Sequence, residues 1–204
     1  MVRVLITGFG PFPGAPFNPS AALAKALARR RRPALAGIER ATHVFATTYA
    51  SVDRELPKLF AQKPDVVLMF GVAGRRHQLC IEVRARNAVS LLFPDAGGHR
   101  PCHGVIKLHG PAALAGNAPF ARLAGAAGPR ARLSRDAGNY LCNYVYWRAL
   151  EQVRGAQPLV QFVHVPPVSA KPRPRRRSKR PPTLAQLLKP AEALLIALIA
   201  ASRR

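Results

Sequence analysis

Three short, almost entirely apolar runs constrain the fold of this chain more than any other feature. The runs are residues 2–7 (VRVLIT), 65–71 (DVVLMFG) and 158–165 (PLVQFVHV). Such runs are typical of strands that are covered on both faces, as in a parallel sheet. Parallel strands need crossover connections, which are usually helices. The pattern therefore predicts an α/β fold in three layers, with a mostly parallel twisted sheet and helices on both faces.

The segments between these runs carry helical patterns. Asn18-Pro19-Ser20 opens an Ala/Leu-rich helix that we expect to run to about Arg32, with Asn18 or Ser20 as its cap. Further helices are expected at residues 51–62, 119–126 and 183–201, and further strands at residues 42–47, 79–84 and 88–93. Strands and helices thus alternate along most of the chain.

Length and composition bound the number of domains and the compartment. With 204 residues and 49% hydrophobic composition, the chain can bury one substantial core, so we expect a single domain over residues 1–204. The first apolar run is too soon broken by Gly and Pro for a signal peptide, and no stretch approaches the length that spans a bilayer. Three cysteines without a Cys-x-x-Cys pair favour a reducing compartment. We expect a soluble cytoplasmic protein without a membrane partner.

The charge is strongly unbalanced, because 32 Lys and Arg residues against 9 Asp and Glu residues give a formal net charge of +23. Such an excess suggests affinity for polyanions, nucleic acid included. The densest clusters are residues 29–32 and residues 171–180, the latter in a basic Pro/Arg-rich loop at about 168–182. Neither cluster has interleaved aromatic residues for base stacking. We interpret both as solvated surface, with nucleic-acid binding as the less favoured alternative.

Cys142 is the best-placed nucleophile in the sequence. Residues 134–153 (SRDAGNYLCNYVYWRALEQV) have the pattern of a turn followed by a helix, with Cys142 in the first helical turn. Free backbone N–H groups and the positive end of the helix dipole favour a thiolate at such a position. The alternative is that Cys142 is a small buried apolar residue.

A cysteine nucleophile needs a base, and His164 is the best candidate. It stands at the end of the last apolar run, and sites in open α/β sheets form at the carboxyl ends of strands. The alternative is a histidine that is satisfied within the core.

The base in turn needs an orienting acceptor, for which Glu82 is the first candidate. Its apolar neighbours predict that Glu82 is partly buried, although an ion pair with Arg84 or Arg86 is the alternative. Asp136 is the other acid near the predicted site, and it also fits an ordinary turn or cap.

Five short motifs, in a fixed order, carry a resemblance to a known family. They are TGFGPF at residues 7–12, NPS at 18–20, GxAG at 71–74 with Glu82 and Asn87 after it, AGNYLCN at 137–143, and FVHVP at 162–166. Together they resemble pyroglutamyl peptidase I, the pyrrolidone-carboxylate peptidases.

The resemblance implies a cysteine peptidase that removes an N-terminal pyroglutamyl residue from peptides. By their positions in the motifs, the resemblance implies that Cys142 is the nucleophile, His164 the general base and then acid, and Glu82 the residue that orients the imidazole. The backbone N–H of Cys142 would hold part of the oxyanion charge, and water would hydrolyse the thioester. No metal or cofactor is required, and the family leads us to expect a homo-oligomer.

The pyroglutamyl ring is flat and uncharged, which predicts a pocket with apolar or aromatic walls and few hydrogen-bonding groups. Phe9, Phe12 and Tyr140 are candidates for these walls, and Asn18 is a candidate for bracing the first loop. Val72, after the glycine that ends the second of the three apolar runs, completes the predicted substrate-binding set. The alternative for Phe9 and Phe12 is packing of the loop against the core.

Three positions depart from the family pattern. Val72 stands where members often carry Gln, Val83 where a basic residue usually follows the catalytic Glu, and Leu92 in place of an Arg associated with the oxyanion. The departures leave two alternatives to an ordinary peptidase. One is an enzyme with weaker activity or shifted specificity, and the other is a divergent member that binds polyanions through its Arg-rich segments.

Overall fold

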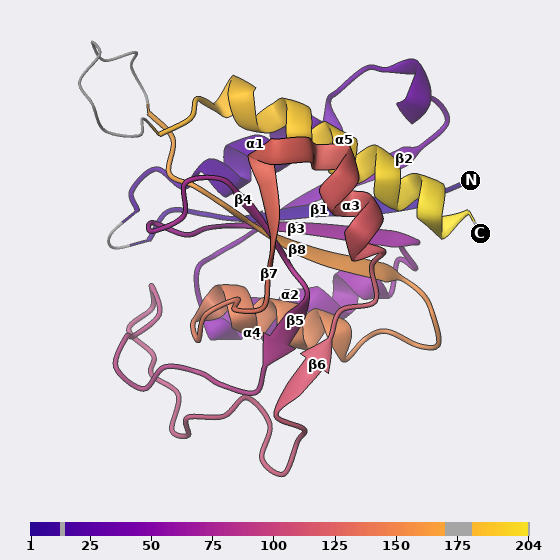
Figure 1. Cartoon of the computed structure of the whole chain (residues 1–204). Helices are drawn as coiled ribbons and strands as arrows, with labels where there is room; N and C mark the ends of the chain where they lie inside the picture. The colour runs from indigo at the N-terminus through magenta and orange to yellow at the C-terminus, as the bar shows by residue number, and fades with distance from the viewer. Residues whose placement is uncertain (13–14, 170–180, 204) are drawn as a thin grey trace.

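The computed structural model describes residues 1–12, 15–169 and 181–203, and its centre is a six-stranded sheet in the order β2-β1-β3-β8-β4-β7 (Figure 1). The strands are β1 (Arg3–Phe9), β2 (Glu39–Phe45), β3 (Val66–Val72), β4 (Leu79–Glu82), β7 (Ala131–Ser134) and β8 (Leu159–Val165). Strands β2, β1, β3 and β8 run parallel, whereas β4 is antiparallel to β8 and parallel to β7. The predicted mostly parallel sheet is confirmed.

Helices cover both faces of the sheet, which confirms the three predicted layers. Figure 1 shows α1 (Pro19–Ala28), α3 (Phe120–Ala127) and α5 (Leu184–Ser202) on one face, and α2 (Tyr49–Phe60) and α4 (Leu141–Leu150) on the other. Two short 3-10 helices, η1 (Pro33–Leu35) and η2 (Gly128–Arg130), complete the helical elements of the described residues.

The two layers of helices explain why the central strands are apolar without interruption. In β3, Val66, Leu68 and Phe70 belong to the core shared with α1, α3 and α5. The alternate residues Val67 and Met69 belong to the core shared with α2 and α4. Since successive side chains of a strand point to opposite faces, both faces must be apolar here.

The first helix is shorter than predicted. It ends at Ala28 instead of about Arg32, and Arg29 forms its C-cap. Pro33, which opens η1, cannot continue an α-helix hydrogen-bond ladder. The carbonyl of Arg30, just after the helix, accepts a bond from Arg40 Nη1 at 2.6 Å. This bond holds the chain where it turns away from α1.

The prediction of a strand at residues 88–93 was wrong, and three short strands, β5 (Arg84–Arg86), β6 (Ala113–Ala115) and β7 (Ala131–Ser134), were missed. Strand β5 pairs with β6 in a small second sheet, and residues 88–93 form no strand. Where β5 ends, the side chain of Asn143 makes the hydrogen bonds that a neighbouring strand would otherwise make. Its amide donates to the carbonyls of Arg86 and Ala88 at 2.8 and 2.9 Å. Strands of three or four residues, such as β6 and β7, carry too few side chains to show a period.

The prediction that no stretch approaches the length needed to span a bilayer was wrong for helix α5. Its 19 residues, with a mean hydropathy of 1.7, are long and apolar enough to cross a bilayer by length and composition alone. Half of that window is buried inside the protein, where Leu194, Leu195 and Leu198 pack in the core shared with α1 and α3. A core helix of a globular fold satisfies the same criterion, so α5 is weak evidence for a membrane.

The two basic clusters fall differently in the structure. Residues 170–180, which hold most of the predicted basic loop, lie outside the described residues. Its flanks are described and meet, because the N–H of Ser169 donates to the carbonyl of Pro182 at 3.2 Å. In the other cluster, Arg30 and Arg32 form ion pairs with Glu192 of α5 at 3.0 and 2.8 Å.

Candidate active site

Cys142 is the second residue of α4, at the position that the sequence predicts. Tyr140 is the N-cap, and its side chain makes no capping bond to the first turn. Its hydroxyl donates instead to the carbonyl of Pro94 at 2.8 Å. The first turn therefore presents its backbone N–H groups, and the positive end of the helix dipole, beside the half-buried Cys142 thiol.

A glycine in the neighbouring strand makes room for the sulfur. Gly71 lies in β3, and a Cβ at this position would come within 2.6 Å of Cys142 Sγ and 2.8 Å of Phe162 Cζ. Neither atom is the end of a long, flexible side chain that could move away easily. The sequence motif GxAG thus has a steric role, since its first glycine leaves the space that the thiol occupies.

His164 and Glu82 form a buried pair beside this thiol. His164 Nδ1 and Glu82 Oε1 are 2.8 Å apart, and the two residues are 5% and 0% exposed. The antiparallel register of β4 and β8 pairs Cys80 with His164, which puts Glu82, two residues later, on the same face of the sheet. The ring of Phe162 packs edge-on against the imidazole at 5.0 Å between centroids. With Nδ1 bonded to Glu82, Nε2 is the nitrogen available to the thiol.

The alternative partners of Glu82 are engaged elsewhere. Arg84 Nε donates to the carbonyl of Arg135 at 2.9 Å, and Arg86 lies 3.6 Å from the Asp136 carboxylate. The backbone carbonyl of Glu82 accepts bonds of 3.0 Å from Tyr146 and Gln161, which fixes the strand at this point.

The electrostatics of the site favour a charged imidazole. Burial by itself lowers the pKa of His164, but the charge and hydrogen bond of Cys142 and those of Glu82 outweigh burial and raise the pKa to about 10. A protonated imidazole between two acidic groups is the state that stabilises a thiolate nucleophile.

A cavity of about 670 Å³ opens above Cys142 and His164. Its walls are largely apolar or aromatic and include Phe12, Val72, Phe93, Pro94 and Tyr140. Its charged lining residues are Arg75, Arg76, Asp95 and Asp136. In size and in lining it fits a small, flat, uncharged group.

Three of the five residues expected to bind substrate line this cavity, namely Phe12, Val72 and Tyr140. Phe9 is instead buried in the core, with its ring 5.8 Å from that of Phe45 between centroids. Asn18 caps α1 and donates from Nδ2 to the carbonyl of Gly10 at 3.0 Å, so it braces the first loop without lining the cavity.

Sequence reasoning missed the contribution of the loop that follows β5. Phe93, Pro94 and Asp95 of this loop line the cavity. Asp95 is buried and accepts bonds of 3.0, 2.9 and 2.9 Å from the backbone N–H groups of Tyr49, Gly97 and His99. The clues were a turn signal, in which Ala96 and two glycines follow a Pro-Asp pair, and the family resemblance at Leu92 of the same loop.

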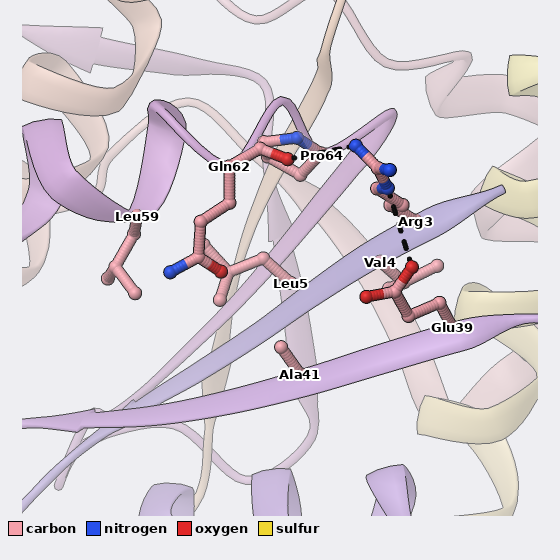
Figure 2. A pocket seen from close by; sticks show the side chains of 8 residues that line it. All are labelled: Arg3, Val4, Leu5, Glu39, Ala41, Leu59, Gln62 and Pro64. Carbon is pink, nitrogen blue, oxygen red and sulfur yellow. Dashed lines mark hydrogen bonds and ion pairs between the residues drawn. The ribbon is translucent and has the colours of Figure 1, made fainter.

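A second cavity, of about 280 Å³, lies at the amino end of β1 (Figure 2). Figure 2 shows Arg3 between Glu39, at 3.4 Å, and the carbonyl of Gln62, at 3.5 Å. No thiol, hydroxyl or imidazole lines it, and ligands of open α/β sheets bind at the opposite, carboxyl end of the strands. The described residues also hold no group of three or more metal-ligating side chains.

An α/β sheet that presents a thiol, an imidazole and a buried carboxylate at one cavity defines the class of the cysteine-type hydrolases. Comparison with known proteins gives the family within this class. The pyroglutamyl peptidase family matches residues 2–204, and the chain belongs to this family. The resemblance carried by the sequence motifs is confirmed.

Individual relatives agree with this placement. The pyrrolidone-carboxylate peptidase of Gloeobacter violaceus is 33% identical over 170 residues, covering 81% of this chain and 82% of the relative. That of Bacillus subtilis is 32% identical over 170 residues, covering 80% and 78%. Among solved structures, pyroglutamyl peptidase I of Bacillus amyloliquefaciens has a TM-score of 0.80 and 26% identity over 100% of this chain and 98% of the other. The pyrrolidone carboxyl peptidase of Thermococcus litoralis has a TM-score of 0.84 and 27% identity, covering 100% and 96%.

Proposed function

We propose that this chain hydrolyses the bond after an N-terminal pyroglutamyl residue of peptides, with Cys142 as nucleophile, His164 as general base and acid, and Glu82 as the residue that orients the imidazole. The observation that carries the proposal is the buried His164–Glu82 pair beside a thiol at a helix N-terminus. Membership of the pyroglutamyl peptidase family supports the choice of substrate.

In the first step the Cys142 thiolate attacks the carbonyl carbon of the pyroglutamyl residue, and a carbon–sulfur bond forms. The negative charge moves to the carbonyl oxygen, where the backbone N–H of Cys142 can bind it. The raised pKa of His164 keeps its imidazole protonated beside the sulfur. The positive charge of this imidazolium can balance the negative charge of the attacking thiolate.

The tetrahedral intermediate then collapses. His164 donates its Nε2 proton to the leaving nitrogen as the carbon–nitrogen bond breaks, and the peptide departs with a free amine. The neutral imidazole next takes a proton from water, which attacks the thioester. The carbon–sulfur bond breaks, pyroglutamate leaves, and the thiolate and imidazolium are restored. Glu82 keeps Nδ1 bonded through both steps and so holds Nε2 toward the reacting atoms.

The cavity suits the proposed substrate. Phe12, Val72 and Tyr140 supply apolar surface for a ring that carries no charge. Val72 lacks the amide that relatives often carry at this place, and Leu92 is 76% exposed and does not line the cavity. Recognition of the lactam must therefore come from backbone groups and from the remaining side chains. We expect weaker binding of pyroglutamate than in relatives that carry Gln at the place of Val72 and Arg at the place of Leu92.

The test is hydrolysis of a chromogenic pyroglutamyl amide by wild type, Cys142→Ser and Cys142→Ala, with Cys102→Ser as the matched control because Cys102 is an exposed thiol away from the site. We expect turnover by wild type and by Cys102→Ser, and loss of at least about 10³-fold in both Cys142 variants. Turnover that survives in Cys142→Ala would contradict the proposed nucleophile. Absence of turnover in a folded wild type would contradict the proposed substrate.

Two finer expectations belong with this proposal. The large apolar side chains of Leu91, Leu92 and Leu108 are exposed on the segment between β5 and β6, and burial between copies of the chain would remove them from water. We therefore propose a homo-oligomer, which light scattering after size exclusion would detect. We also propose a cytoplasmic location, since all three cysteines, which lie in the described part of the chain, are free.

The hypothesis of polyanion binding receives less support. Two of the four arginines in the cluster at residues 29–32 already pair with Glu192. Arginines that already form ion pairs within the protein are less available to bind phosphates.

A further inference from the structure

Apart from the reacting groups Cys142 and His164, four charged residues line the active-site cavity, and three of them are bound to the protein itself. Asp95 accepts three backbone N–H groups, as described above. Asp136 lies 3.6 Å from Arg86, and its carbonyl accepts a bond from Arg76 Nη2 at 3.1 Å. The fourth, Arg75, is exposed and makes no hydrogen bond or ion pair within the part of the chain that the structure describes. Its charge is therefore available to a ligand in the cavity.

Backbone hydrogen bonds fix the turn that carries Arg75 relative to the strand that carries His164. Ala73 follows β3 and donates its N–H to the carbonyl of Val165 at 2.9 Å, directly after His164 in β8. The chain then turns, and the N–H of Arg76 donates to the carbonyl of Ala73 at 3.0 Å. Arg75 stands in this turn, so it lines the cavity just beyond the strand end that carries His164.

The proposed mechanism puts the leaving side of the substrate toward the same strand end. In the proposed mechanism His164 gives its proton to the leaving nitrogen, so the peptide that departs must extend past the imidazole. The pyroglutamyl ring, on the other side of the scissile bond, has no charge for a guanidinium to bind. A cation beside the leaving peptide can bind a carboxylate on that peptide.

We infer that Arg75 is a specificity residue that favours leaving peptides with a carboxylate close to the scissile bond. The carboxylate has two possible sources, namely an acidic side chain on the residue after pyroglutamate and the C-terminus of a pyroglutamyl dipeptide. The inference rests on the proposed function. Because Arg75 is exposed, its contribution is that of a solvated ion pair, about two- to fivefold in kcat/KM at low salt.

The experiment compares kcat/KM for four peptides in which only the carboxylate changes. Pyroglutamyl-alanine is set against its amide, and the amide of pyroglutamyl-glutamate against that of pyroglutamyl-glutamine. The variants are Arg75→Gln, which removes the charge, and Arg75→Lys, which retains it. Arg122→Gln is the matched control, because Arg122 lies exposed on α3 and its loss changes the net charge equally.

The expected result is a carboxylate preference of about two- to fivefold in wild type and Arg122→Gln, carried by KM, that falls toward unity in Arg75→Gln and largely survives in Arg75→Lys. The preference should also weaken in 0.5 M salt. The pair of substrates that shows it identifies the source of the carboxylate. If neutral amides are cleaved and Arg75→Gln keeps the same ratios as wild type, the inference is wrong while the proposed function stands. If none of the four peptides is cleaved, the proposed function fails, and the inference fails with it.

Discussion

Gly71 stands against the sulfur of Cys142 so closely that a single added methyl group at position 71 would come within 2.6 Å of Sγ. The glycine belongs to a central strand and the cysteine to a helix about seventy residues later in the chain. In the parallel register of β3 and β8, Gly71 is also the residue paired with His164. This one backbone position therefore limits the space of the thiol and lies beside the strand residue that carries the imidazole.

We predict that Gly71→Ala lowers kcat/KM by at least about tenfold, because a displacement of the thiol by a fraction of an ångström spoils its alignment. The rate of alkylation of Cys142 by iodoacetamide should fall as well. Gly125→Ala is the matched control, since Gly125 lies in α3 with no atom near the added methyl group. Full activity in Gly71→Ala would show that the site has more room than the structure gives it.

Replacement of Glu82 by Gln keeps an oxygen that can accept the Nδ1 proton of His164 but removes the charge. The raised pKa of His164 owes part of its shift to Glu82, so this pKa should fall in the variant. We expect the alkaline limb of the profile of kcat/KM against pH to move to lower pH, with a loss of at least about tenfold at the optimum. An unchanged alkaline limb would mean that Glu82 does not act on the imidazole.

The same pair affects folding stability in a defined pH window. Because the pKa of His164 is raised from 6.5 to about 10 in the folded state, its contribution is complete below pH 6.5 and is lost as the pH rises through about 10. The difference in unfolding free energy between wild type and Glu82→Gln should therefore shrink across this window. Urea unfolding at several pH values measures it.

Asn143 holds the backbone that follows β5, and its loss should destabilise the fold. Its side chain is fully buried and makes three bonds of 2.8, 2.8 and 2.9 Å to backbone groups of Arg86 and Ala88. We predict that Asn143→Ala lowers the free energy of unfolding by about 1–3 kcal/mol, because partly buried backbone groups lose their partners. Asn143→Leu restores the volume without the bonds and should be nearly as unstable. Wild-type stability in the Leu variant would assign the effect to packing instead.

Glu192 joins α5 to the end of α1 through Arg30 and Arg32. These hydrogen bonds and charges overcome the effect of burial, which alone would raise the pKa of Glu192, and hold this pKa below its usual value. A lowered pKa stabilises the folded state above the unfolded value of about 4.5, and the contribution disappears as the pH falls through the folded value. We expect Glu192→Gln to cost about 1 kcal/mol at pH 7, since both arginines are partly exposed, and much less at pH 3. A cost that is the same at both pH values would count against the ion pairs.

Local patterns in the sequence were sufficient for much of the fold and for the local positions of Cys142 and His164. Uninterrupted apolar runs report burial on two faces, so β1, β3 and β8 were predicted within two residues at each end. Cap and turn residues placed Cys142 in the first turn of a helix, where the structure has it. The end of an apolar run selected His164 and apolar neighbours selected Glu82, and the fold brings these two side chains to a distance of 2.8 Å.

What failed was local structure that depends on distant partners. Residues 88–93 have an apolar composition, yet Asn143 takes the backbone bonds of residues 86 and 88. Phe9 and Phe12 look alike in sequence, but only Phe12 lines the cavity while Phe9 packs on Phe45. Two aromatic residues three positions apart, at the end of a strand and in the loop after it, cannot be told apart until the opposing surface is known.

The sequence by itself determined the α/β class and predicted the proposed nucleophile and base, because burial, capping and residue chemistry are read from neighbours along the chain. Only the tertiary structure decided which side chains share the cavity, why Gly71 must be a glycine, and that Arg75 has no partner among the described residues. These properties are distances between segments far apart in the chain. They follow from strand order and register, in which an antiparallel β4 beside β8 brings Glu82 to His164.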